Sequence, residues 1–148
     1  MEINGLPLHP LLVHAAVVLG PLAALAALLY VVVPRWRDTL RWPMLVVVLV
    51  ATAAIWAAYL SGVNFRASKD FFTQGAIGER VQTHADLAAK LRLMTSGFAV
   101  VGIAAAWLHD RGGAVRVVLG VLLALAAVGT LVLTVLTGEA GSRAVWGS

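Results

Sequence analysis

The chain contains no cysteine among its 148 residues. Disulfide bonds, thiolate metal sites and cysteine-ligated iron–sulfur clusters are therefore excluded. The motifs of common enzymes are also absent: there is no Walker motif, dinucleotide fingerprint, nucleophile elbow or zinc-protease helix. Nothing in the sequence supports hydrolysis, and the pattern favours a protein that is not an enzyme.

Charged residues are scarce as well. They make up 12% of the chain, against about 25% in an average soluble domain, whereas hydrophobic residues reach 61%. A small domain leaves a large share of its surface exposed, so a soluble fold cannot hide this much apolar surface. We expect the surplus to face a lipid bilayer. The net charge of +4 does not indicate nucleic acid, because the eleven Lys and Arg are scattered between apolar runs.

Four apolar runs are long enough to span a bilayer, which takes about 20 residues for roughly 30 Å of hydrocarbon. They are residues 11–33, 43–60, 91–108 and 115–136. Pro10 opens the first run and Pro34 ends it. A cleaved signal peptide is not expected, because the N-terminus lacks a positive region and the run that follows is too long.

The connections predict how the spans are arranged. Residues 34–42 and 109–114 are short, so two antiparallel hairpins are expected. The longer segment between them is expected to be an irregular loop over 61–75 and helical from Gly78. The sequence therefore predicts an all-α fold in one domain, residues 1–148, built as an up-down-up-down four-helix transmembrane bundle.

Positive charge predicts the orientation. The two short loops carry five arginines, and the long segment carries five Lys and Arg diluted by Asp70, Glu79 and Asp86. The density of positive charge in short loops decides orientation, so we expect these loops in the cytoplasm. Both termini and the long segment would then face outward.

Three of the four histidines fall at one side of the membrane. His9 and His14 stand at the start of the first span and His84 lies shortly before the third. A rise of about 1.5 Å per residue places His84 near the outer interface, level with His9 and roughly one turn above His14. His109 lies at the opposite side, in a short loop, and is expected to be solvated or to contact headgroups.

A helical wheel predicts where these side chains point. His84 shares a stripe with residues expected to pack inside the bundle, which are Ala88, Leu91, Thr95, Phe98 and Gly102. His9 and His14 are about 140° apart on the wheel, so both cannot face one point. We expect His14 to point inward, because His9 precedes Pro10 and lies at or before the helix N-terminus.

Two interpretations of the histidines remain open. Ionisable groups in a membrane are costly, so they mark a functional place or a satisfied polar network. His14 and His84 could ligate a b-type haem or a metal ion, with His9 as a supporting partner or alternative ligand. Alternatively, the histidines bond to backbone carbonyls, the long loop or the C-terminal tail and lock the bundle. A third interpretation, a small solute or metal transporter, is weakened by the lack of an inverted repeat.

The last span ends in polar residues at the same side. Thr130, Thr134 and Thr137 recur at helical spacing and are expected to join helices, or to line a polar path from the histidines. The tail TGEAGSRAVWGS is expected to be a solvated tail or a cap. In it Glu139 and Arg143 would pair with each other or close over the site, so they and Thr137 are candidate supporting residues.

Three segments carry a family resemblance. The opening LPLHPLLVHAAVVLGPLAAL, the His84 segment and the tail TGEAGSRAVW together resemble the bacterial domain of unknown function 2231 family. The resemblance covers almost the whole chain and implies a small multi-pass protein of the bacterial cytoplasmic (inner) membrane. Association of some relatives with redox modules implies electron transfer. Haem b, a quinone or a redox partner protein would then be involved, and a homo-oligomer is a further expectation.

Overall fold

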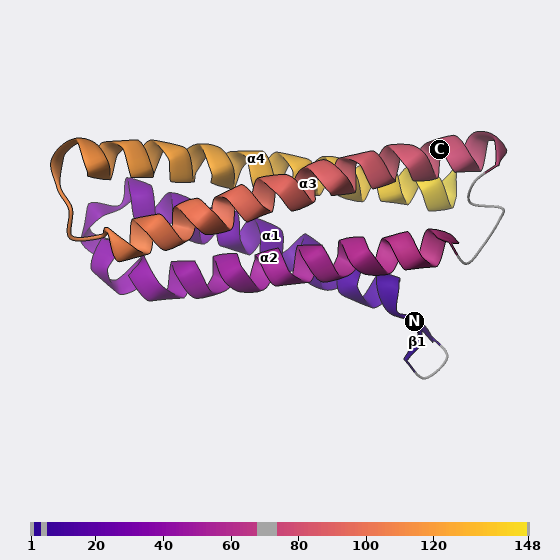
Figure 1. Cartoon of the computed structure of the whole chain (residues 1–148), viewed down its shortest axis with the longest axis horizontal. Helices are drawn as coiled ribbons and strands as arrows, with labels where there is room; N and C mark the ends of the chain where they lie inside the picture. Colours follow the sequence, from indigo (N-terminus) through magenta and orange to yellow (C-terminus); the bar gives the residue numbers. More distant parts are fainter. Residues whose placement is uncertain (1, 4–5, 68–73, 148) are drawn as a thin grey trace.

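In a computed structural model, four long helices lie side by side in one elongated bundle (Figure 1). The structure describes residues 2–3, 6–67 and 74–147. The helices are α1 (Leu8–Val32), α2 (Arg37–Ala67), α3 (Gly75–Trp107) and α4 (Gly113–Trp146). A short antiparallel hairpin, β1 (Glu2–Ile3) and β2 (Leu6–Pro7), precedes α1, and a 3-10 turn, η1 (Pro34–Trp36), leads into α2.

The helices follow one another around the bundle in chain order. α1 packs against α2 and α4, and α3 packs against the same two helices, so α1 and α3 lie diagonally. Successive helices run in opposite directions (Figure 1), which confirms the predicted all-α, up-down-up-down bundle. We call the end with His9, His14 and His84 the histidine end. The opposite end, which holds Arg35, Arg37, Arg41, Arg111 and Arg116, is called the arginine end.

The distribution of side-chain size explains why this bundle belongs in lipid. All four helices are long and apolar enough to cross a membrane. Large apolar side chains point outward, with Val18, Val100 and Leu125 each more than 60% exposed. The centre instead contains small residues such as Ala23 and Ala27, which are fully buried and let the helices approach closely.

The helices extend beyond the predicted spans, mainly at the histidine end. The irregular loop predicted for 61–75 is wrong in its first part, because residues 61–67 continue α2; residues 68–73 lie outside the described residues. The predicted tail is also wrong, since α4 continues to Trp146. These polar segments pack on neighbouring helices: Ser61 lies against His9 of α1, and Thr137 lies against His84 of α3.

Candidate functional site

His9 is held in the first turn of α1 by the C-terminal half of α2. Its Nδ1 lies 3.0 Å from the Ala58 carbonyl oxygen and 3.1 Å from Ser61 Oγ. The Ser61 hydroxyl donates its only proton to the same carbonyl at 2.8 Å, so its oxygen accepts from His9. A carbonyl oxygen only accepts, so Nδ1 of His9 carries the proton and Nε2 of the neutral ring keeps its lone pair.

His84, near the start of α3, is held by α4 in the same way. Its Nδ1 donates to the carbonyl oxygen of Thr137 at 2.9 Å. The neutral ring is therefore also in the Nδ1–H form, with a lone pair on Nε2. The wheel prediction is confirmed along α3, where Leu91, Thr95 and Phe98 are buried below His84.

The two rings meet at the histidine end although their helices are diagonal. The ring centroids of His9 and His84 are 6.4 Å apart, with an interplanar angle of 70°. This confirms that the two residues lie at one level. Phe65 of α2 also stacks on His9, with ring centroids 6.1 Å apart and planes inclined by 24°.

Two glycines make room for the imidazoles. A Cβ added to Gly62 on α2 would lie 2.9 Å from His9 Cε1, which real Cβ atoms essentially never do. A Cβ on Gly141 of α4 would lie 3.1 Å from Cε1 and Nδ1 of His84. A larger residue at either position must displace a ring or a helix. The helix backbones therefore approach both imidazoles more closely than any side chain would permit.

His14 does not take part in this arrangement, and the prediction that it points inward is wrong. Its side chain is exposed, and its Nδ1 lies 2.6 Å from the carbonyl oxygen of Pro10 in the same helix. The reason is where the helix begins. α1 starts at Leu8, so His9 is inside the first turn and takes the inward position that only one of the two histidines can have.

The other predicted supporting residues divide into two groups. Thr137 contacts His84 through its carbonyl oxygen, and its own hydroxyl is buried without a hydrogen-bond partner among the described residues. Glu139 and Arg143 form an ion pair with each other at 2.6 Å, with both side chains more than half exposed. Thr134 donates to the Thr130 carbonyl oxygen at 2.8 Å, as expected for threonines between packed helices.

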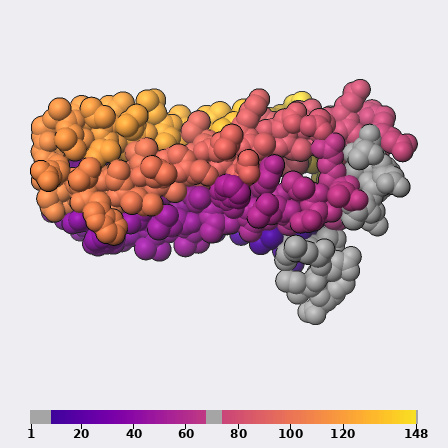
Figure 2. Space-filling model, in the orientation of Figure 1, coloured from indigo at the N-terminus to yellow at the C-terminus, as the bar shows by residue number. Residues whose placement is uncertain are grey.

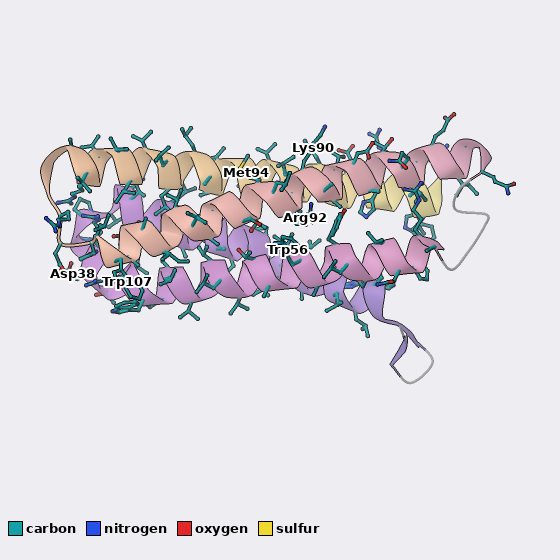
Figure 3. All side chains as sticks on the ribbon, viewed as in Figure 1. Asp38, Trp56, Lys90, Arg92, Met94 and Trp107 are labelled. Atoms are coloured by element: carbon teal, nitrogen blue, oxygen red, sulfur yellow. The ribbon has the colours of Figure 1, made fainter. Side chains whose placement is uncertain are left out.

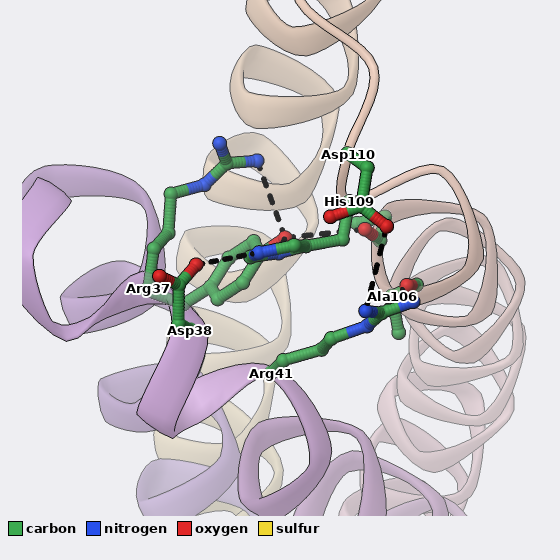
Figure 4. A network of polar contacts seen from close by, with 8 residues as sticks. Arg37, Asp38, Arg41, Ala106, His109 and Asp110 are labelled. Carbon is green, nitrogen blue, oxygen red and sulfur yellow. Dashed lines mark hydrogen bonds and ion pairs between the residues drawn. The ribbon is translucent and has the colours of Figure 1, made fainter.

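A second polar cluster, at the arginine end, was not expected from the sequence (Figure 4). His109 is only 9% exposed, so the prediction that it is solvated is wrong. Its Nε2 donates to Asp38 Oδ1 at 2.8 Å, and its Nδ1 lies 3.0 Å from the Tyr30 hydroxyl oxygen. That hydroxyl donates to the Ala105 carbonyl oxygen at 3.1 Å and accepts from Arg37 Nη2 at 3.2 Å.

One signal in the sequence could have revealed this cluster. Tyr30 follows Ala23 and Ala27 at helical spacing, on the face that the structure buries. A buried tyrosine hydroxyl needs a polar partner, which must come from the loops at that end. His109 is the histidine in those loops.

A third cluster lies between α2 and α3 in the histidine half of the bundle (Figure 3). The Arg92 guanidinium carbon is 4.6 Å from the ring centroid of Trp56 and 4.6 Å from that of Tyr59. Trp56 Nε1 donates to Ser96 Oγ at 3.0 Å, and Arg92 Nε is buried without a partner among the described residues. Two aromatic rings thus hold an arginine on the side of the bundle.

Among curated proteins and among solved structures, none matches this chain. A family model does match it. Residues 5–148 fit the model described as "Predicted membrane protein (DUF2231)", which covers nearly the whole chain, both inward-facing histidines and the C-terminal helix. The chain therefore belongs to the DUF2231 family, as the resemblance of its opening and its tail indicates.

Proposed function

We propose that the protein is a membrane module that holds a b-type haem between His9 and His84 at the histidine end. One observation carries the proposal. Two imidazoles from diagonal helices come within 6.4 Å of each other, and each has Nδ1 bound to a backbone carbonyl, so that Nε2 is the available ligand atom. Histidines that ligate metals are oriented by this kind of contact at their second ring nitrogen.

The number of donors favours haem over a bare ion. In the described part of the chain, no group of three or more His, Cys, Asp or Glu side chains is placed to hold a metal ion. A bare transition-metal ion requires about three or four protein ligands. Haem brings its own ring of nitrogen ligands, so two protein ligands, His9 and His84, would be enough to hold it.

The spacing of the rings fits the same assignment. A bound haem would be held by one imidazole nitrogen from each histidine, so the two rings have to lie close together. The observed centroid distance is 6.4 Å. In the space-filling view the surface is hollowed at this end, between the last turns of α2 and the first turns of α3, with α4 visible behind (Figure 2). The unpartnered Thr137 hydroxyl offers a donor to a bound group there.

The setting supports one-electron transfer as the role. Bound haem would supply that chemistry, while His9 and His84 fix its position and the carbonyls of Ala58 and Thr137 fix the ring tautomers. With the arginine end in the cytoplasm, the site lies at the outer face of a bacterial inner membrane. A quinone or a redox protein would exchange electrons with it there.

A second candidate function is structural, and one observation favours it. The hydrogen bond of His9 joins α1 to α2, and that of His84 joins α3 to α4. Each histidine therefore joins the two helices of one pair, and the contact between the two rings joins the pairs, without any cofactor. In this case the protein is a non-catalytic accessory protein of the membrane.

The visible spectrum of the detergent-purified protein, before and after titration with haemin, separates the two. Haem binding predicts a sharp Soret band at one haem per chain, lost in His9→Ala and in His84→Ala. His14→Ala is the matched control, because His14 is exposed and bonded within its own helix, and it should keep the band. A colourless protein that binds no haemin, but whose melting temperature falls in His84→Ala, would establish the structural function instead. Equal loss of the Soret band in all three variants contradicts the assignment of His9 and His84 as haem ligands.

A further inference from the structure

A groove at the arginine end lies apart from both histidines of the proposed haem site. It has a volume of about 350 Å³ and runs between α1 and α4, with the start of α2 at its mouth. Tyr30 and Val31 of α1, Arg37 of α2, and Arg116 and Gly120 of α4 line it. The groove thus has two arginines at the level of the connecting loops and an apolar floor nearer the middle of the membrane.

Among the described residues, the arginines at the mouth have no carboxylate partner. The described acidic residues at this end are Asp38 and Asp110, which bind His109 and Arg41. Arg37 contacts the hydroxyl and the ring of Tyr30, and Arg116 is exposed. In the described part of the chain, neither Arg37 nor Arg116 lies within ion-pair distance of an acid. The groove is therefore lined by two arginines and, among the described residues, by no acidic side chain.

The rest of the groove fits a hydrocarbon chain. Val117 and Val121 line it and are 64% and 53% exposed on a helix that spans the membrane, so the groove opens towards lipid. Gly120 leaves the floor without a side chain: a Cβ there would lie in ordinary contact with Val31 Cγ1, at 3.7 Å, and a longer side chain would fill the groove. Tyr30, which is 1% exposed, accepts a hydrogen bond from Arg37 Nη2 at 3.2 Å and so holds that arginine at the mouth.

We propose that this groove binds an acidic phospholipid. Its phosphate lies between Arg37 and Arg116, and one acyl chain lies along Gly120. Basic pockets between transmembrane helices on the cytoplasmic side are suited to such headgroups, and the cytoplasm is where positive charge places this end. A zwitterionic lipid would fit the floor but leave the charge uncompensated, and a free phosphate would use the mouth alone.

The test is lipid retention by the purified protein, measured by native mass spectrometry after exchange into mixed micelles of phosphatidylglycerol and phosphatidylcholine. The wild type should retain phosphatidylglycerol preferentially. Arg116→Gln should weaken retention about fivefold, as expected for loss of one arginine at a lipid surface. Arg111→Gln is the matched control, because it removes the same charge from the same end but outside the groove lining. If the two variants weaken retention equally, the groove is not the binding site, and the lipid is attracted only by the overall positive charge of the arginine end.

A second variant tests the acyl chain. Gly120→Leu fills the floor without changing charge, and it should reduce phosphatidylglycerol retention while leaving the circular dichroism spectrum unchanged. Inorganic phosphate at equal concentration should compete poorly. If phosphate displaces the lipid fully, or Gly120→Leu has no effect on retention, the site is an anion site and the lipid assignment is wrong. Neither result bears on the haem titration, because the groove and the histidine pair lie at opposite ends.

Discussion

His109 and Asp38 form a 2.8 Å hydrogen bond across the arginine end, although the His109 side chain is 8% exposed and that of Asp38 is 93% exposed. The pair connects the α3–α4 connection to the start of α2, and through Tyr30 it also reaches α1. These hydrogen bonds therefore link the buried side chains of Tyr30 and His109 to the carboxylate of Asp38 at the surface.

Replacing His109 should destabilise the bundle. His109→Ala leaves the Tyr30 hydroxyl with fewer partners and removes a buried ring, so the free energy of unfolding should fall by about 1–3 kcal/mol. Tyr30→Phe should also be destabilising. The double variant should lose less unfolding free energy than the two single variants lose together, since the two side chains contact each other. Thermal unfolding in detergent measures all three, and strict additivity would show that the contact contributes nothing.

A methyl group at Gly141 should disturb the histidine end, whereas one at Gly138 should not. Both glycines lie in α4, and Ala is favoured over Gly in a helix by roughly 1 kcal/mol. A Cβ at Gly138 meets nothing within 4 Å, but one at Gly141 lies 3.1 Å from the His84 ring. We expect Gly138→Ala to raise the melting temperature and Gly141→Ala to lower it, together with haemin affinity. Identical shifts would mean that the close packing on His84 has no energetic role.

Arg92 should contribute to stability through its two aromatic contacts. Arg92→Gln keeps a polar side chain but removes the cation held by Trp56 and Tyr59, for an expected loss of about 1–2 kcal/mol. Lys90→Gln is the control, because Lys90 is an exposed cation two residues away. Chemical unfolding in mixed micelles gives both values. Equal, small effects would show that the arginine is held only weakly.

The arginine-rich loops should face the cytoplasm. A fluorescent reporter that is dark in the periplasm should be dark at the C-terminus and bright when inserted after Gly112, between α3 and α4. The reverse pattern would place the histidine end inside the cell. Alkaline phosphatase fused at the same two positions should give the opposite signals and serves as the control.

The number of helices and their pairing were predictable because they depend on local properties. Four apolar runs need lipid on the outside, and short connections force neighbouring helices to be antiparallel. The inward direction of His84 was predictable too, because α3 is regular from Gly75 to Trp107 and a wheel applies along its whole length. The helix ends were not predictable, since polar residues 61–67 and 137–146 pack on neighbouring helices through contacts with His9 of α1 and His84 of α3.

By itself, then, the sequence determined a four-helix membrane bundle with histidines gathered at one end. The tertiary structure decided which of them meet. Whether His9 or His14 faces His84 depends on where α1 begins and how it is rotated, and neighbouring helices determine both. His109 is buried for the same kind of reason: Tyr30 and Asp38 come from residues 71 or more positions away, and only packing brings them together.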